Sequence, residues 1–344
     1  MFLGIEIGGT KLQLGVGPGD GAPPRALERF DVQPEHGALG ILRQIESAAP
    51  ILINRHKISA IGIGFGGPVD TPAGRVLKSH QIDGWDDFAL ADWCRQQLGL
   101  PAQLQNDCDM AALAEARFGA GRHHKVVFYV TVGTGIGGGL VIDGHIYRGH
   151  GPGAAEIGHL RPGLHADKPE QTVESLASGW GIAAAAQERL AEPHAHQFLP
   201  FTGGSNPHHP DQVRQRLIEA EAAAEEYSAD LLQRCDGQVD RLTAKMVAQA
   251  AGEGNELARD VLARAAQTLG WAIAQVVTLL SPDVIVVGGG VSLAEESLFL
   301  EPLRKEVERY VFPPFRDTYR LVRAELGELV VVYGALAIAT EAGR

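Results

Sequence analysis

Three glycine-rich turns follow apolar, strand-like segments in this 344-residue chain. The turns are Gly8-Gly9-Thr10-Lys11, Gly133-Thr134-Gly135 and Gly288-Gly289-Gly290. Glycine lets main-chain N–H groups come close to a ligand, and successive N–H groups form concavities that suit phosphate oxygens. A single turn of this kind is more often a structural device. Three of them, each after an apolar strand, favour a nucleotide-binding cleft.

The turns do not match the two best-known phosphate-binding motifs. No GxxxxGK[ST] sequence occurs, which argues against a P-loop enzyme. The segment from Gly133 to Gly138 matches GxGxxG, the dinucleotide fingerprint. That fingerprint must open a helix, whereas the β pattern LVIDGHIY follows here. Binding of NAD is therefore disfavoured.

A carboxylate that could act as a base lies at Asp107. The strand predicted over 101–107 leads directly into a helical pattern, and Asn106 is the expected N-cap. A helix N-terminus favours the ionised form of a carboxylate, so Asp107 should accept a proton at neutral pH. From the residues alone, an ordinary capping aspartate is the simpler interpretation.

Two further polar residues, Glu156 and His159, are three apart in the sequence AAEIGH. On a helical turn, residues with this spacing face the same side. Together they could accept and donate hydrogen bonds to vicinal hydroxyl groups. The histidines of the segment 190–240 could hold a metal, but polar loop residues are the simpler interpretation.

The overall composition is that of a soluble globular protein, with 45% hydrophobic and 21% charged residues. The length predicts two domains. The net charge of −12 disfavours a general nucleic-acid or membrane-surface role. The three cysteines show no CxxC spacing, so we expect reduced thiols and a cytoplasmic location. We expect neither a signal peptide nor a membrane span.

Strand and helix patterns alternate along the chain and predict an α/β architecture. The segments 2–16 and 126–149 share one scheme, in which a glycine turn joins two apolar strands. This similarity predicts an internal duplication with one hairpin opening each half. We expect residues 1–120 and a closing helix near 331–344 to form the first domain. Residues 121–330 form the second, with an insert near 190–240.

The motifs together resemble those of the ROK family, which comprises sugar kinases, related open reading frames and transcriptional repressors. The resemblance covers nearly the whole chain outside the insert. It rests on the following segments, which occur in the expected order: GIEIGGTK, GFGGPVD, QNDCDMAALAEA, GTGIGGGLVIDGHIYRG, GAAEIGHL and DVIVVGGGVS. The resemblance implies two ribonuclease-H-like domains of the actin-like ATPase fold with a cleft between them. It also implies homodimers, which such proteins often form.

The resemblance assigns roles to individual residues. Asp107 matches the catalytic aspartate of the family. The implied sugar-binding residues are Gly66, Gly67, Asn106, Asp107, Glu156, His159 and Glu174. The residues implied to bind ATP are Glu6, Gly8, Gly9, Thr10, Lys11, Gly133, Thr134 and Gly135 around the phosphates, and Gly288, Gly289 and Gly290 near the adenosine. Mg²⁺ would bridge the phosphates with few protein ligands.

The sequence departs from the family pattern at two places. Glu6 stands where the family usually has Asp, and the longer side chain could shift the phosphates. The segment after His159 lacks the cysteines of the family's structural zinc site. His159, His165 and Asp167 match no standard zinc spacing, so we expect no resident metal site in the protein. The chain begins at the first strand, so the helix-turn-helix domain of the repressors, and with it DNA binding, is not expected.

Three functions remain in competition. The leading hypothesis is an ATP-dependent kinase that phosphorylates a hexose or N-acetylhexosamine, with O6 as the expected acceptor and Asp107 as the base. The second is a sugar-binding or regulatory protein with little kinase activity, suggested by Glu6 and the missing cysteines. The third is glycoside chemistry by Asp107 and Glu156, which the intact glycine turns disfavour.

Overall fold

The computed structural model describes residues 1–79, 81–151, 153–163, 168–191 and 210–342. Two five-stranded sheets form the two halves of the molecule. The first sheet has the order β3-β2-β1-β4-β7 and the second has the order β10-β9-β8-β11-β12. The strands of the first sheet are β1 (Phe2–Ile7), β2 (Lys11–Gly17), β3 (Ala26–Asp31), β4 (Ala60–Phe65) and β7 (Ala102–Asn106). Those of the second are β8 (Val126–Val132), β9 (Ile136–Ile142), β10 (His145–Ile146), β11 (Val284–Gly288) and β12 (Arg320–Arg323).

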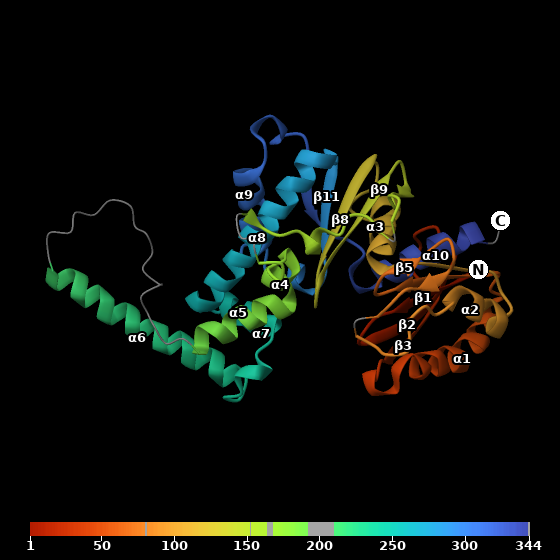
Figure 1. The fold of residues 1–344 in the computed structure, drawn as a ribbon, viewed down its shortest axis with the longest axis horizontal. Helices are drawn as coiled ribbons and strands as arrows, with labels where there is room; N and C mark the ends of the chain where they lie inside the picture. The colour runs from red at the N-terminus through yellow and green to blue at the C-terminus, as the bar shows by residue number, and fades with distance from the viewer. Residues whose placement is uncertain (80, 152, 164–167, 192–209, 343–344) are drawn as a thin grey trace.

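The two sheets repeat one topology. In each, three consecutive strands pair antiparallel, and two later strands are added in parallel beside the first strand of the half. A short separate hairpin, β5 (Val69–Asp70) and β6 (Arg75–Val76), follows β4. The repeat confirms the duplication that the two glycine-turn hairpins predict. Figure 1 shows the two halves side by side.

Helices cover both faces of each sheet. In the first half, α1 (Gly37–His56) and α2 (Leu90–Leu98) share a core with one face, and α10 (Val330–Ala342) packs on β1 and β4. In the second half, α3 (Asp107–Phe118) packs on β8 and β9, opposite a helical layer. The helices of that layer are α4 (Val173–Ala177), α5 (Gly179–Ala191), α7 (Ala244–Gly252), α8 (Glu256–Leu280) and α9 (Leu300–Tyr310).

The alternation of side chains in β8 explains this double covering. Val127 and Tyr129 join the core cluster of α3 and α10, whereas Phe128 and Val130 join the cluster of α8. Successive residues of a strand point to opposite faces, so a strand that is apolar at every position must be buried on both sides. The continuous apolar run VVFYV therefore requires a helical layer on each face.

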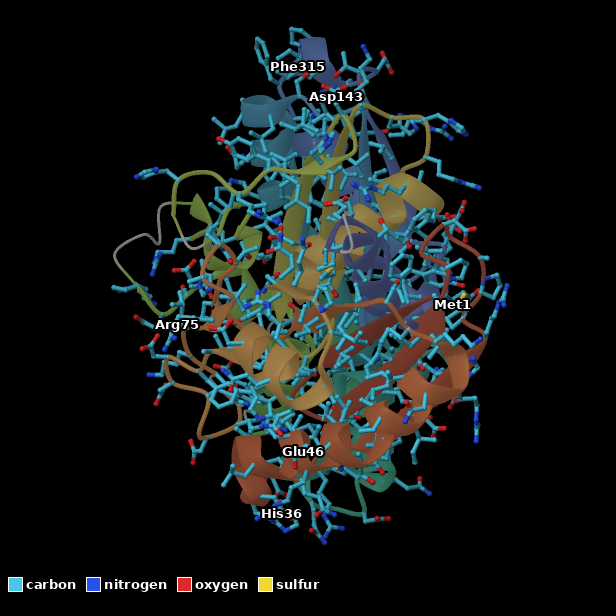
Figure 2. All side chains as sticks on the ribbon, turned by 90° about the vertical axis from the view of Figure 1, so that its right-hand side faces the viewer. Met1, His36, Glu46, Arg75, Asp143 and Phe315 are labelled. Carbon is cyan, nitrogen blue, oxygen red and sulfur yellow. The ribbon has the colours of Figure 1, made fainter. Side chains whose placement is uncertain are left out.

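Helices α3 and α10 pack against each other between the two sheets. Glycines allow α10 to approach both α3 and β4: a Cβ added to Gly334 of α10 would lie 2.2 Å from the Met110 carbonyl oxygen of α3, and one added to Gly62 of β4 would lie 1.9 Å from that of Ala335. The contact between α3 and α10 joins the two halves, and Met110 lies within one helical turn of Asp107. In Figure 2, His36 and Glu46 of the first half lie at one end of the molecule, and Asp143 and Phe315 of the second half lie at the other.

The predicted insert contains α6 (Pro210–Arg234), which extends away from the second half in Figure 1. This helix lies within the insert that the sequence predicts near 190–240. The histidines at 194, 196, 208 and 209 lie outside the described residues. Within the described part of the chain, no helix is long and apolar enough to cross a membrane.

Candidate active site

Two adjoining cavities lie beside the glycine turns. The smaller, of about 340 Å³, is lined by the charged residues Glu6, Lys11 and Asp107 among apolar ones. Gly288, Gly289 and Gly290 also line it. The larger cavity, of about 1050 Å³, is lined by Gly133 and Thr134 and by residues of α5 and α7. Gly290 and Leu293 line both cavities, so the two are neighbours in one cleft.

Asp107 is placed by the junction of β7 and α3. The Asn106 side chain accepts hydrogen bonds from the main-chain N–H groups of Cys108 (2.8 Å) and Asp109 (3.2 Å), which confirms the predicted N-cap. The Asn106 amide also donates to the Gly67 carbonyl oxygen at 3.1 Å. The cap therefore fixes the helix start and ties it to the loop after β4.

The Asp107 carboxylate is poised to exchange a proton near neutral pH. Burial raises its pKa from 3.8 to about 6, and the nearby Glu6 carboxylate adds to the rise. The Cys108 N–H, 2.8 Å from Asp107 Oδ1, acts in the opposite direction. The group is still mostly ionised at pH 7, but burial outweighs the helix N-terminus, so the shift is opposite to the one that the sequence predicts. The carboxylate is therefore a stronger base than an exposed aspartate.

Glu6 is a buried carboxylate held by two partners. Its Oε2 accepts from Gln13 Nε2 at 2.7 Å, and its Oε1 lies 3.2 Å from Lys11 Nζ. Burial raises the pKa of Glu6, while Lys11 and Gln13 oppose that rise. The turn between Glu6 and Lys11 is tight, since Gly8 N–H donates to the Lys11 carbonyl oxygen at 2.9 Å. A cation and a carboxylate thus lie together at the edge of the smaller cavity.

The second glycine turn is held from behind by Glu174. Glu174 Oε2 accepts from the main-chain N–H of Ile136 at 2.9 Å. A Cβ added to Gly135 would lie 2.5 Å from the same oxygen, so a larger residue there would displace the Glu174 carboxylate. The Gly133 carbonyl oxygen accepts from Gly179 N–H at 2.8 Å. Glu174 therefore shapes the turn, whatever contact it makes with a sugar.

The residues implied to bind sugar group around Asp107 and the second turn. Glu156 precedes the single-turn helix η2 (Ile157–His159), and both Glu156 and His159 are exposed. Desolvation by the surrounding protein raises the pKa of Glu156, His159 lowers it, and Glu174 raises it. A Cβ added to Gly66 would lie 3.3 Å from Asp107 Oδ2. The structure thus brings Glu156 together with His159, and Gly66, Gly67 and Asn106 together with Asp107.

Several of the predicted site residues line neither cavity. Among the described residues these are Gly8, Gly9, Thr10, Gly66, Gly67, Asn106, Gly135, Glu156, His159 and Glu174. The remaining ones do, and they are Glu6, Lys11, Asp107, Gly133, Thr134, Gly288, Gly289 and Gly290. Asp107 is thus the residue common to the smaller cavity and to the group of implied sugar ligands.

A buried acidic residue beside the site has no predicted role. Asp109 is only 6% exposed, and burial raises its pKa to about 7. Arg148 opposes that rise, and Glu156 and Asp107 add to it. With its amide oriented to suit its neighbours, the Gln105 side chain accepts from Arg148 at 2.8 and 2.9 Å. The only sequence signal was a second aspartate two positions after Asp107.

The loop after His159 offers little for a resident metal. Within the described residues, no group of three or more His, Cys, Asp or Glu side chains could hold a metal ion. His165 and Asp167, which the sequence places near His159, lie outside the described residues. Absence of such a site therefore stays a prediction.

Comparison with known proteins identifies the family. The model of the ROK family matches residues 2–342. The chain is 31% identical to a glucokinase of Streptomyces coelicolor over 342 residues, which cover 99% of this chain and 98% of that one. It is 30% identical to an N-acetylmannosamine kinase of Escherichia coli, covering 87% and 86%.

A solved structure shares the fold over nearly its whole length. It is that of a ROK family glucokinase from Streptomyces griseus in complex with glucose and AMPPNP, with a TM-score of 0.78, 32% identity and 99% of each chain covered. The expected pair of actin-like ATPase domains is thereby confirmed. The family match over almost every residue, together with this shared architecture, shows that the chain belongs to the ROK family.

Proposed function

We propose that this chain, a sugar kinase of the ROK family, transfers the γ-phosphoryl group of ATP to a hexose, with glucose as the first substrate to test. One observation carries the proposal: Asp107 lines a cavity together with Glu6 and Lys11, and this cavity adjoins a larger one that Gly133 and Thr134 line. Relatives named glucokinase, and a related structure that holds glucose and AMPPNP, support the choice of sugar and donor.

Asp107 is the general base of the proposed reaction. It accepts the proton of the sugar hydroxyl, expected to be O6, as that oxygen attacks the γ-phosphorus. A pKa of about 6 leaves the carboxylate ionised at pH 7 and still basic enough to take the proton. The cap by Asn106 fixes the carboxylate in position, which phosphoryl transfer requires because positioning supplies much of its rate.

The sugar is held by Gly66, Gly67, Asn106, Glu156 and His159 in this proposal, with Glu174 at the edge of the second turn. Polar groups that converge on hydroxyls give steep selectivity, because a missing hydroxyl leaves a protein group without its partner. An N-acetylhexosamine is the second substrate class, supported by the N-acetylmannosamine kinase relative.

ATP lies with its phosphates along Gly8, Gly9, Thr10 and Lys11 and along Gly133, Thr134 and Gly135, and with its adenosine beyond Gly288, Gly289 and Gly290. Mg²⁺ is bound in such sites by one or two carboxylates and by the phosphates. Glu6 fits this role, because its carboxylate reaches the smaller cavity beside Lys11 and Asp107. Bound there, Mg²⁺ would neutralise charge on the phosphates.

We also propose that the two halves act as the domains expected from the sequence, residues 1–120 with the closing helix and residues 121–330. The protein is proposed to work in the cytoplasm, where ATP is available, without nucleic acid or membrane as partners. A homodimer is the oligomeric state to test first, by light scattering of the purified protein.

The alternative is a sugar-binding or regulatory protein with weak phosphoryl transfer. The observation that favours it is Glu6, whose carboxylate is already paired with Lys11 and Gln13. A panel of hexoses and N-acetylhexosamines, assayed with ATP and Mg²⁺, separates the two. Turnover of one sugar that disappears in Asp107→Asn supports the kinase. Thermal stabilisation by a sugar without turnover supports the alternative.

A further inference from the structure

One tryptophan differs from the other three in its surroundings. Trp180, the second residue of α5, is 47% exposed, whereas Trp85 is 1% exposed and Trp93 and Trp271 are half-buried. A large aromatic side chain open to solvent buries less apolar surface than it could. The Trp180 side chain lines the larger cavity of the cleft.

The backbone ties Trp180 to the second glycine turn. Gly179 N–H donates to the Gly133 carbonyl oxygen at 2.8 Å, and Trp180 N–H donates to that of Thr134 at 3.5 Å. Gly133 and Thr134 line the same cavity as the indole. The main chain of Trp180 therefore lies directly beside a turn that is proposed to hold phosphate oxygens.

The rest of the cavity provides a mainly apolar space for a flat ring. Ala244 and Ala248 of α7 line it, as do Val291, Leu293 and Leu298 around the single-turn helix η6 (Gly290–Leu293). Its volume of about 1050 Å³ is ample for a nucleoside, and at Gly290 and Leu293 it adjoins the smaller cavity, which the charged side chains of Glu6, Lys11 and Asp107 line. A ligand with a charged end and a flat apolar end fits this pair of cavities.

We propose that Trp180 is the platform on which the base of the nucleoside triphosphate stacks, and that it selects a purine nucleotide over phosphate donors without a base. The assignment rests on the proposed function, because the phosphates must lie along the glycine turns for the base to reach the indole. Purines give the larger stacking area. The adjacent glycine turn contributes to phosphate binding and does not distinguish one base from another.

Two variants and two ligands test this role. AMPPNP and inorganic tripolyphosphate, each with Mg²⁺, are titrated by calorimetry into the wild-type protein, Trp180→Phe and Trp180→Ala. Loss of one base–aromatic stack typically weakens binding about tenfold to a hundredfold. We expect that loss for AMPPNP in Trp180→Ala, a smaller loss in Trp180→Phe, and tripolyphosphate affinity unchanged within about twofold. In kinetics, the KM for ATP rises while kcat on the sugar is kept.

The outcomes separate this inference from the proposed function. If Trp180→Ala binds AMPPNP as tightly as the wild-type protein does, the stacking role of Trp180 is refuted and the proposed kinase function is unaffected. An equal loss for tripolyphosphate shows that the substitution merely disturbs the turn, and it also refutes the platform. Failure of the wild-type protein to bind AMPPNP removes the proposed function, and the platform with it. Tryptophan emission gives an independent reading: AMPPNP should change it in the wild-type protein and much less in Trp180→Phe.

Discussion

Replacing Asp109 by Asn should stabilise the protein at neutral and alkaline pH. Asp109 is almost completely buried, and that burial raises its pKa from 3.8 to about 7. The folded protein therefore holds this proton more tightly than the unfolded chain does. Its free energy of unfolding falls as pH rises between these two values, because the native carboxylate must then ionise in a poorly solvated place. Asparagine has a similar shape and nothing to ionise.

The size of the effect follows from the same numbers. One pKa unit corresponds to about 1.36 kcal/mol, so a rise from 3.8 to about 7 gives a ceiling of about 4 kcal/mol above pH 7. The gain should shrink towards pH 4, close to the pKa of 3.8 in the unfolded chain, and disappear below it, where Asp109 is protonated in both states. Arg148 faces this carboxylate, and the attraction lost in the variant lowers the net gain.

Urea unfolding of wild-type protein and Asp109→Asn at several pH values between 4 and 8 measures this difference. The control is Asp86→Asn, which removes an exposed carboxylate of the same kind. The reasoning predicts that only Asp109→Asn gains stability with rising pH. It is refuted if the two variants show the same pH dependence, or if Asp109→Asn is less stable than the wild-type protein at pH 8.

Three further predictions concern the proposed reaction. Because burial raises the pKa of Asp107 to about 6, kcat/KM for the sugar should fall about tenfold per pH unit below pH 6. A kcat/KM that stays constant down to pH 5 would contradict this. Glu6→Gln keeps the shape of the side chain but removes the charge beside Lys11. We therefore expect kcat with Mg²⁺ and ATP to fall about tenfold or more. The control is Glu6→Asp, which keeps the charge. Glu174→Ala leaves the Ile136 N–H without its acceptor. We expect the free energy of unfolding to fall by about 1–3 kcal/mol and the KM for ATP to rise. A rise in the KM for the sugar alone would favour direct sugar binding by Glu174.

Features that depend on neighbouring residues can be predicted from the sequence. The Asn106 cap, the glycine turns and the strand pairs around the first two turns all follow from local patterns, and the structure contains each of them. The repeated sheet order follows from the likeness of the two hairpins. The edge strands β3 and β12 are not predicted, because ALERFD carries three charged residues and RLVR has only four residues.

Features that depend on contacts between distant segments are absent from the sequence pattern. Arg148 donates to Gln105, which is 43 positions away in the chain, and neither segment has a sequence pattern that predicts the contact. In the sequence Trp180 has no feature that distinguishes it from other helix residues. Its position in the cavity follows only from the packing of α5 beside the second turn. Glu174 was assigned to the sugar by resemblance, and its hydrogen bond to Ile136 becomes visible only in the fold.

The most direct test of the account is a paired measurement on Asp107→Asn: its kcat for ATP-dependent phosphorylation of glucose, and its Kd for glucose by calorimetry. The substitution keeps the size of the side chain and removes its ability to accept the hydroxyl proton. The account predicts that kcat falls by about 10²-fold or more while the Kd for glucose changes by less than about tenfold. A variant that turns over glucose at a rate close to that of the wild-type protein would show that Asp107 is not the base.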